Sequence, residues 1–158
     1  HGTCIVKDDL SPLLTKAKEA DALLFGSPIY FMGLTSGMHA LLERLFFSNY
    51  IYSQEIPSVL GKKMPSAFIY TMNVTEEQAK EAHLQQNVAA QEAFADRILG
   101  MPPKSLWAYN TLQFNDYSKY ESSVFSESDK KAYQEKAGPI CLKQAYAIGQ
   151  SLVQDAGK

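Results

Sequence analysis

Short apolar runs alternate with longer helical stretches along this whole chain, and this alternation is its most constraining feature. Three runs have the character of strands buried on both faces, Ala22–Phe25, Ser66–Tyr70 and Ser105–Tyr109. We expect the first to end at Gly26-Ser27-Pro28, which cannot continue a regular strand. The alternation is typical of an α/β fold with a mainly parallel sheet, so we expect the three runs to be neighbouring strands.

The helical stretches around these runs have recognisable ends. They cover 12–20, 36–47, 75–99 and two segments on either side of Gly138-Pro139. Thr75 and Gln78 form a capping-box pattern, which predicts one long helix running to about Leu99. Gly138-Pro139 is expected to end one helix and start another. The apolar stripe of that last helix, which would cover the edge of the sheet, is Ala145, Ile148, Leu152 and Val153.

The order of these elements predicts a single domain over residues 1–158. Right-handed crossovers between parallel strands would place helices on both faces of the sheet. The expected fold is α/β, a doubly wound parallel sheet in a three-layer α/β/α sandwich. Ligands bind such sheets at the carboxyl ends of the strands, so the candidate site residues are those that follow Phe25, Tyr70 and Tyr109.

Composition argues against several kinds of partner. The 158 residues carry a net charge of -2 and no basic cluster, so we expect neither nucleic acid nor an anionic membrane as a partner. No apolar run reaches the ~18 residues of a membrane span, and the opening HGTC has no signal-peptide pattern. Cys4 and Cys141 are far apart and show no disulfide pattern, so we expect a reducing, cytoplasmic setting. The start without Met is expected to reflect a fragment whose natural start lies upstream.

The stretch after the first strand combines several features of a ligand site. Residues 26–37 contain three glycines and lead directly into the helix over 36–47. Glycines let a backbone approach a ligand closely, and a helix start offers free N–H donors with partial positive charge. Tyr30 and Phe31 add flat surfaces suited to an aromatic ligand that carries carbonyl oxygens. A plain strand-to-helix turn with two core aromatics explains the same residues.

Four blocks of the sequence resemble the NADPH-dependent FMN reductase and iron–sulfur flavoprotein group, whose members are flavodoxin-like. The blocks are CIVKDDL at 4–10, ADALLFGSPIYF at 20–31, LER at 42–44 and FNDYSKY at 114–120. The resemblance implies an FMN held by loops at the carboxyl ends of the strands. The implied cofactor-binding residues are Ser27, Pro28, Ile29, Tyr30, Phe31 and Gly33 in the first loop, with Thr71, Met72 and Asn73 in the second. The family's first strand and phosphate loop are expected to precede residue 1 and to be lacking here.

The resemblance also implies an activity, with alternatives. The protein would be an FMN-dependent oxidoreductase that takes a hydride from NAD(P)H, passes electrons to a flavin, quinone or similar acceptor, and acts as a homodimer or homotetramer. The flavin does the chemistry itself, so no catalytic side chain is named. An electron carrier without NAD(P)H reductase activity and an inactive relic without cofactor are the alternatives. A net charge of -2 gives little acidic docking surface, which favours the enzyme over the carrier.

Cys4 would be the last of the cluster-binding cysteines in those members that carry an iron–sulfur cluster, with the others upstream. A buried structural thiol is the alternative that we favour, and no metal site is predicted from the residues present.

Other residues are expected to have structural roles. Asp8-Asp9 would cap the first helix, and Glu43 with Arg44 would form an ion pair or an inter-subunit contact. His39 stands where the family usually has a lysine, and would be solvated or packed, or would tune the flavin. The aromatic segment 107–125 would pack over the sheet end, or form a lid or a dimer contact.

Overall fold

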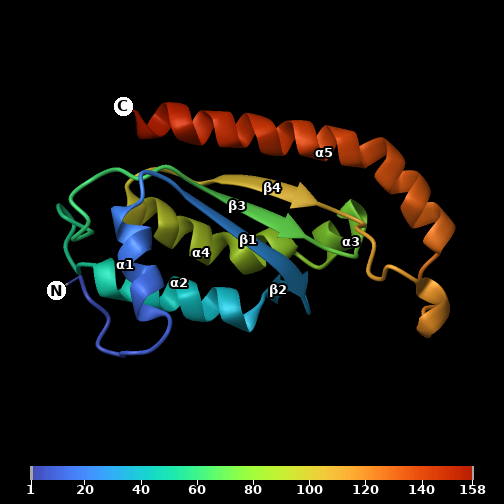
Figure 1. Ribbon diagram of the computed structural model, residues 1–158, viewed down its shortest axis with the longest axis horizontal. Coiled ribbons are helices and arrows are strands. Elements are labelled where there is room, and N and C mark those ends of the chain that lie inside the picture. Colours follow the sequence, from blue (N-terminus) through green and yellow to red (C-terminus); the bar gives the residue numbers. More distant parts are fainter. Residues whose placement is uncertain (1, 158) are drawn as a thin grey trace.

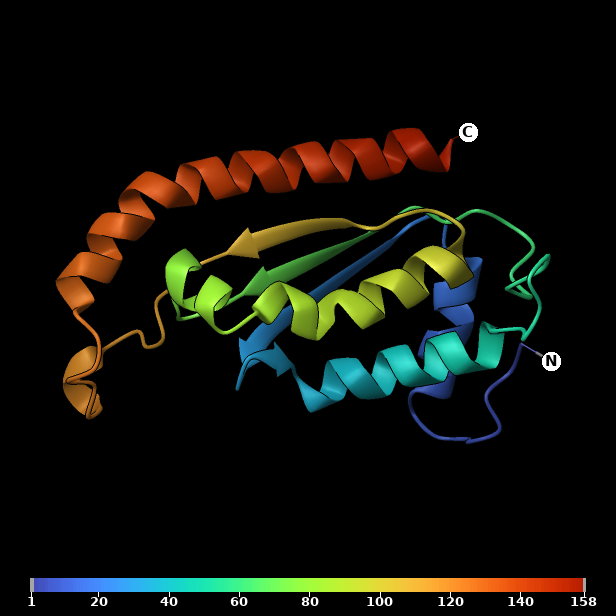
Figure 2. The same ribbon diagram turned by 180° about the vertical axis from the view of Figure 1, so that it is seen from behind.

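The computed structural model describes residues 2–157 and shows a four-stranded sheet between two layers of helices (Figure 1). The elements are α1 (Ser11–Glu19), β1 (Leu23–Tyr30), β2 (Gly33–Leu34), α2 (Ser36–Asn49), β3 (Ser66–Thr71), α3 (Glu76–Glu81), α4 (Leu84–Leu99), β4 (Lys104–Ala108), the 3₁₀ helix η1 (Tyr117–Lys119) and α5 (Glu127–Ala156). The sheet order is β2-β1-β3-β4, with β1, β3 and β4 parallel. Helices α1, α2 and α4 lie on one face and α5 spans the other, as both views show (Figure 2). The predicted three-layer α/β fold is confirmed.

The three predicted strands are neighbours in the sheet, and the first is longer than predicted. β3 and β4 agree with their predicted bounds to within one residue. β1 continues through Gly26-Ser27-Pro28 to Tyr30, so the prediction that this triplet ends the strand is wrong. Pro28 lies opposite Thr71 in the last parallel pair of β1 with β3, where a missing N–H interrupts no interior part of the ladder.

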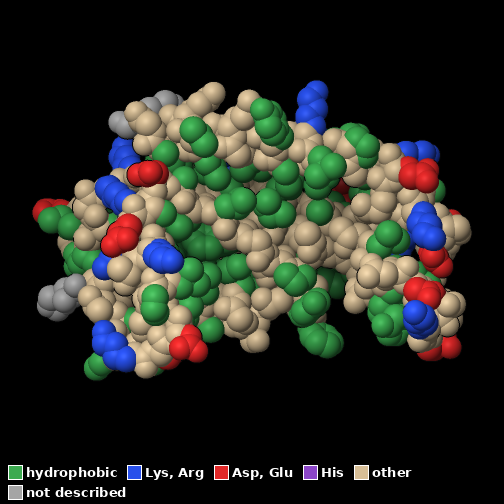
Figure 3. All heavy atoms as spheres, viewed as in Figure 1, with side chains coloured by type: hydrophobic (Ala, Val, Ile, Leu, Met, Phe, Trp, Pro, Cys, Tyr) green, Lys and Arg blue, Asp and Glu red, His purple; other side chains and the backbone are tan. Residues whose placement is uncertain are grey.

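β1 is buried on one face only. Phe25 and Ile29 pack into the core on the side of α1, α2 and α4, whereas Leu24 on the opposite face is 57% exposed. α5 packs over β4 and β3. Among residues 2–157, no strand pairs with the outer edge of β1 along Leu23–Pro28. Hydrophobic side chains gather over the middle of the face seen in Figure 3, with most charged side chains toward its two ends.

The predicted long helix over 75–99 is two helices. The capping box at the start of α3 is confirmed, since Thr75 accepts from the Gln78 N–H and Gln78 accepts from the Thr75 N–H. The chain then breaks at His83, whose φ is 53°, and α4 begins at Leu84. In one straight helix the buried residues Ala79 and Leu84 would point ~140° apart, because each residue turns a helix by roughly 100°. The break lets both side chains reach the core.

The final helix does not end at Gly138-Pro139, contrary to prediction. α5 runs for 30 residues with Pro139 in its interior, and it is visibly curved (Figure 1). A proline removes one backbone hydrogen bond, which a long helix packed on a sheet accommodates by bending. Leu152 is buried as predicted, but Val153 is 75% exposed and does not belong to the sheet-facing stripe. No helix within residues 2–157 is both long and apolar enough to cross a bilayer.

Candidate functional site

A tight turn at the carboxyl end of β1 forms the first part of the candidate site. Tyr30 pairs with Gly33, which leaves Phe31 and Met32 as the two turn residues, with φ of 49° and 60°. Positive φ at both central positions marks a type I′ turn, which usually contains glycine, asparagine or aspartate. Strained residues of this kind cluster at functional sites. Phe31 is fully exposed and Tyr30 is 57% exposed, so the turn presents two aromatic surfaces at the end of the strand.

Hydrogen bonds from the surrounding elements hold this turn in place. The Asn87 side-chain N–H of α4 donates to the Met32 carbonyl at 2.9 Å. Ser27 is buried, donates to the Pro28 carbonyl at 2.8 Å and accepts from the Thr35 N–H at 3.3 Å. Thr35 in turn caps α2. The turn is therefore fixed before any ligand arrives, and the role of Ser27 in this structure is to hold the loop.

The predicted site residues differ in which side of the sheet they face. Ile29 and Met72 have side chains buried in the core, so only their backbone atoms are available at the strand ends. Pro28 and Tyr30 lie on the opposite, exposed face of β1. Gly33 has no positive φ, and an added Cβ would come no closer than 4.0 Å to the Tyr30 carbonyl, so the local backbone does not itself require glycine there.

The loop after β3 is bonded to the loop after β4, and together they form the second part of the site. The Met72 carbonyl accepts from the Thr111 N–H, and the Asn110 N–H donates to the Val74 carbonyl, both at 2.8 Å. Asn73, between these bonded residues, has a buried side-chain oxygen with no partner in residues 2–157. An unsatisfied buried acceptor typically costs about 1–3 kcal/mol, and a ligand N–H would satisfy this atom if the Asn73 side chain turned toward the strand ends. Because β1 and β3 are adjacent, the aromatic turn and Asn73 lie at neighbouring strand ends.

Lys130, in the first turns of α5, belongs to the same region and was not predicted. Its Nζ donates to the Asn73 carbonyl at 2.7 Å and to the Asn110 side-chain oxygen at 2.6 Å. The side chain is only 4% exposed, and burial lowers the pKa of its ammonium group. In the sequence, Lys130 lies in a polar helix start beside Lys131, where no pattern separates a buried lysine from a solvated one.

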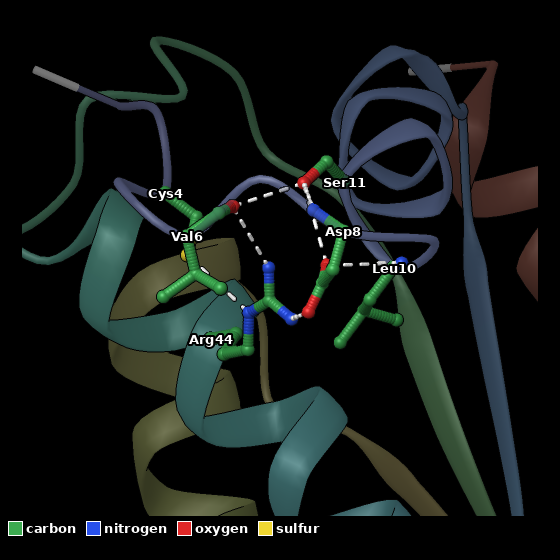
Figure 4. Close-up of polar contacts among 6 residues, drawn as sticks. All are labelled: Cys4, Val6, Asp8, Leu10, Ser11 and Arg44. Atoms are coloured by element: carbon green, nitrogen blue, oxygen red, sulfur yellow. Dashed lines mark hydrogen bonds and ion pairs between the residues drawn. The ribbon is translucent and has the colours of Figure 1, made fainter.

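A separate polar cluster lies between the amino-terminal segment and the second half of α2, away from the carboxyl ends of the strands (Figure 4). The Arg44 guanidinium donates to the Asp8 carboxylate at 2.6 Å, to the Cys4 sulfur at 3.3 Å and to the Val6 carbonyl at 3.2 Å. The hydrogen bond from Arg44 lowers the pKa of the Cys4 thiol and that of the Asp8 carboxyl group.

This cluster bears on two predictions. Among the described residues, Arg44 forms its ion pair with Asp8 and not with Glu43, while the alternative of an inter-subunit contact stays a prediction. Asp8 does not cap α1, because the Asp8 carboxylate accepts from the Leu10 N–H in a turn before the helix. The N-cap of α1 is Leu10, and no side chain caps it.

The remaining candidates are placed as follows. Cys4 is a half-buried free thiol, and residues 2–157 bring together no group of three metal-ligating side chains. His39 lies exposed on α2. In the aromatic segment, Phe114 stacks on Tyr120 at 4.1 Å between ring centroids and meets the Tyr117 ring edge-on, so these rings pack on one another.

Comparison with known proteins gives the family. Residues 1–95, more than half of the chain, match the family described as NADPH-dependent FMN reductase. The chain belongs to the NADPH-dependent FMN reductase family. The part that matches contains the aromatic turn and the Thr71–Asn73 loop, both at the strand ends where this family was expected to bind its cofactor.

Two curated relatives of this FMN reductase family member are iron–sulfur flavoproteins. The one from Methanocaldococcus jannaschii is 42% identical over 44 residues, which are 28% of this chain and 23% of the relative. The one from Archaeoglobus fulgidus is 29% identical over 69 residues, which are 44% of this chain and 29% of the relative. The matches thus span about a quarter of the length of these relatives.

Solved structures with the same fold include general stress protein 14 of Treponema denticola in complex with FMN, with a TM-score of 0.57 and 14% identity. That similarity covers 90% of this chain and 74% of the other. An NAD(P)H:quinone oxidoreductase of Methanothermobacter marburgensis has a TM-score of 0.51 and 16% identity, covering 70% of this chain and 59% of that one. These similarities confirm the flavodoxin-like fold.

Proposed function

We propose that this protein is an FMN-dependent oxidoreductase that takes a hydride from NAD(P)H and passes electrons to a small acceptor such as a quinone or flavin. The observation that carries the proposal is the strained, exposed aromatic turn at Phe31, which hydrogen bonds hold in place at the carboxyl end of β1. Membership of the FMN reductase family supports the same chemistry.

The residues at the strand ends fit the ring portion of a flavin. Tyr30 and Phe31 offer aromatic faces, and the unpartnered Asn73 oxygen, once its side chain turns toward the ring, would accept from an imide N–H such as the one that a flavin carries. Pro28 would also contact the ring with its side chain, and Ile29, Thr71 and Met72 with their backbone. The contacts proposed for these residues are all with the ring.

Binding and orientation are the tasks of the protein in this proposal. When bound, FMN itself supplies the hydride and electron transfer. The turn at Phe31 and the loop at Asn73 would fix the ring between adjacent strand ends, and N–H groups directed at its polar edge would stabilise negative charge there. No side chain is required as a general acid or base.

The test is the visible absorption spectrum of the intact protein, recorded before and after adding NADPH without oxygen. A yellow protein that bleaches with NADPH is the expected result. Bleaching with dithionite alone would favour an electron carrier, and a colourless protein that takes up no added FMN would contradict the proposal. A broad brown absorption would instead indicate an iron–sulfur cluster that includes Cys4.

A further inference from the structure

Lys130 is a buried cation that has no carboxylate partner in the described part of the chain. Its side chain is 4% exposed, and no ion pair within residues 2–157 includes it. The ammonium group is surrounded by neutral groups: the Asn73 carbonyl, the Asn110 side-chain oxygen, the Thr111 carbonyl at 3.4 Å and the Phe125 ring at 5.2 Å.

These contacts join α5 to the two loops that form the second part of the candidate site. The Asn73 carbonyl belongs to the loop after β3, and Asn110 and Thr111 belong to the loop after β4. Gln134, one turn further along α5, donates to the Asn110 carbonyl at 3.0 Å. Asn110 itself has a φ of 50°, so these hydrogen bonds also hold a residue whose backbone lies in the left-handed region.

A buried charge without an opposite charge is a poor way to stabilise a fold. Its desolvation is costly, and neutral oxygens offset only part of that cost. A ligand that brings negative charge to these loops would supply the missing partner. Lys130 bonds the backbone of Asn73, whose side-chain oxygen is the unpartnered buried acceptor.

We infer that Lys130 is a positioning residue for the flavin, and that its positive charge behind the Asn73 loop makes the site bind reduced, anionic FMN more tightly than oxidised FMN. This inference rests on the proposed function. The ammonium group acts through the loop that it holds, and it takes no part in hydride transfer. Selective binding of the reduced form raises the midpoint potential of the bound cofactor.

The experiment compares Lys130→Met with Lys131→Met in the intact protein. Lys131 is the adjacent lysine, is largely exposed and pairs with Glu127, so its replacement makes the same change of charge without touching the loops. The measurements are the dissociation constant for oxidised FMN, the midpoint potential and the thermal unfolding curve. For Lys130→Met we expect reduced FMN to lose about tenfold more affinity than oxidised FMN, which is a fall of about 30 mV for a two-electron couple. Lys131→Met should keep the wild-type potential.

The outcomes separate this inference from the proposed function. A folded Lys130→Met variant with the wild-type potential would overturn the role of Lys130 and leave the proposed function standing. A wild-type protein that binds no FMN would overturn both. If Lys130→Met does not unfold cooperatively, Lys130→Gln and Lys130→Arg replace it: a lower potential in the glutamine variant supports the inference, and equal potentials refute it.

Discussion

Phe31 has a backbone conformation that favours glycine, yet its ring is fully exposed, so its side chain contributes little to the stability of the fold. We therefore expect Phe31→Gly to raise the free energy of unfolding by about 1 kcal/mol, because glycine adopts positive φ without strain. The same change should weaken FMN binding by roughly 1 kcal/mol through lost ring contact. Chemical denaturation and flavin-fluorescence titration measure the two effects.

Tyr30→Ala provides the comparison for this variant. Tyr30 has no positive φ, so its replacement should weaken FMN binding by a similar ~1 kcal/mol without a gain in stability. Phe47→Ala, which removes an exposed aromatic side chain from the far end of α2, is the control for loss of an aromatic residue away from the site. If both Phe31→Gly and Tyr30→Ala bind FMN as the wild type does, the ring lies elsewhere.

Cys4 gives a prediction on pH dependence. The hydrogen bond from the Arg44 guanidinium favours the thiolate, so the pKa of Cys4 lies below its ordinary value of about 8.5. Alkylation of Cys4 by iodoacetamide should therefore reach half its maximal rate at a lower pH than for an ordinary thiol. Arg44→Met should move that midpoint to higher pH. The measurement uses a Cys141→Ser background, and an unchanged midpoint in Arg44→Met would show that the guanidinium does not control this thiol.

At the scale of elements, the register of α5 on the sheet is testable with adjacent residues. Leu152 is buried under the helix and Val153 is exposed. Leu152→Ala should lower the free energy of unfolding by about 2–4 kcal/mol, because it leaves a cavity against the sheet. Val153→Ala should change it by less than about 0.5 kcal/mol. Urea denaturation of both variants decides the matter, since similar losses would mean that α5 packs in another register.

The sequence predicted those elements well that are marked by capping residues or by short apolar runs. The Thr75–Gln78 capping box and the short apolar strands were found because caps and buried runs leave clear residue patterns. The break at His83 has no glycine or proline to mark it, and it exists because Ala79 and Leu84 must both face the core. Pro139 was given too much weight as a helix breaker, since α5 stays helical across it and bends (Figure 1). β2 has two residues, too few to show any periodicity.

At the scale of the whole molecule, topology determined how much of the site could be predicted. The parallel strands place the Phe31 turn and the Asn73 loop side by side, so finding the strands was enough to locate them. Lys130 is 57 residues beyond Asn73, and the two meet only because α5 packs back across β4. No local pattern carries that information.

The distribution of apolar surface leads to a prediction about assembly. Charged side chains lie mostly at the two ends of the face shown in Figure 3, and hydrophobic side chains fill its middle. Large exposed apolar patches mark interaction sites. We therefore expect the intact protein to form a homodimer or homotetramer. Light scattering across a tenfold range of concentration measures this, and a mass equal to one protomer at every concentration would rule it out.

The one-sided pairing of β1 should also be visible in how fast its amide protons exchange with solvent. Along Leu23–Ser27 of this chain, alternate N–H groups point toward β3 and toward the open edge. Protection should then alternate from residue to residue in β1, while β3, paired on both sides, is protected throughout. Any strand that binds along that edge would erase the alternation, so the amide protons of β1 report whether the edge is occupied.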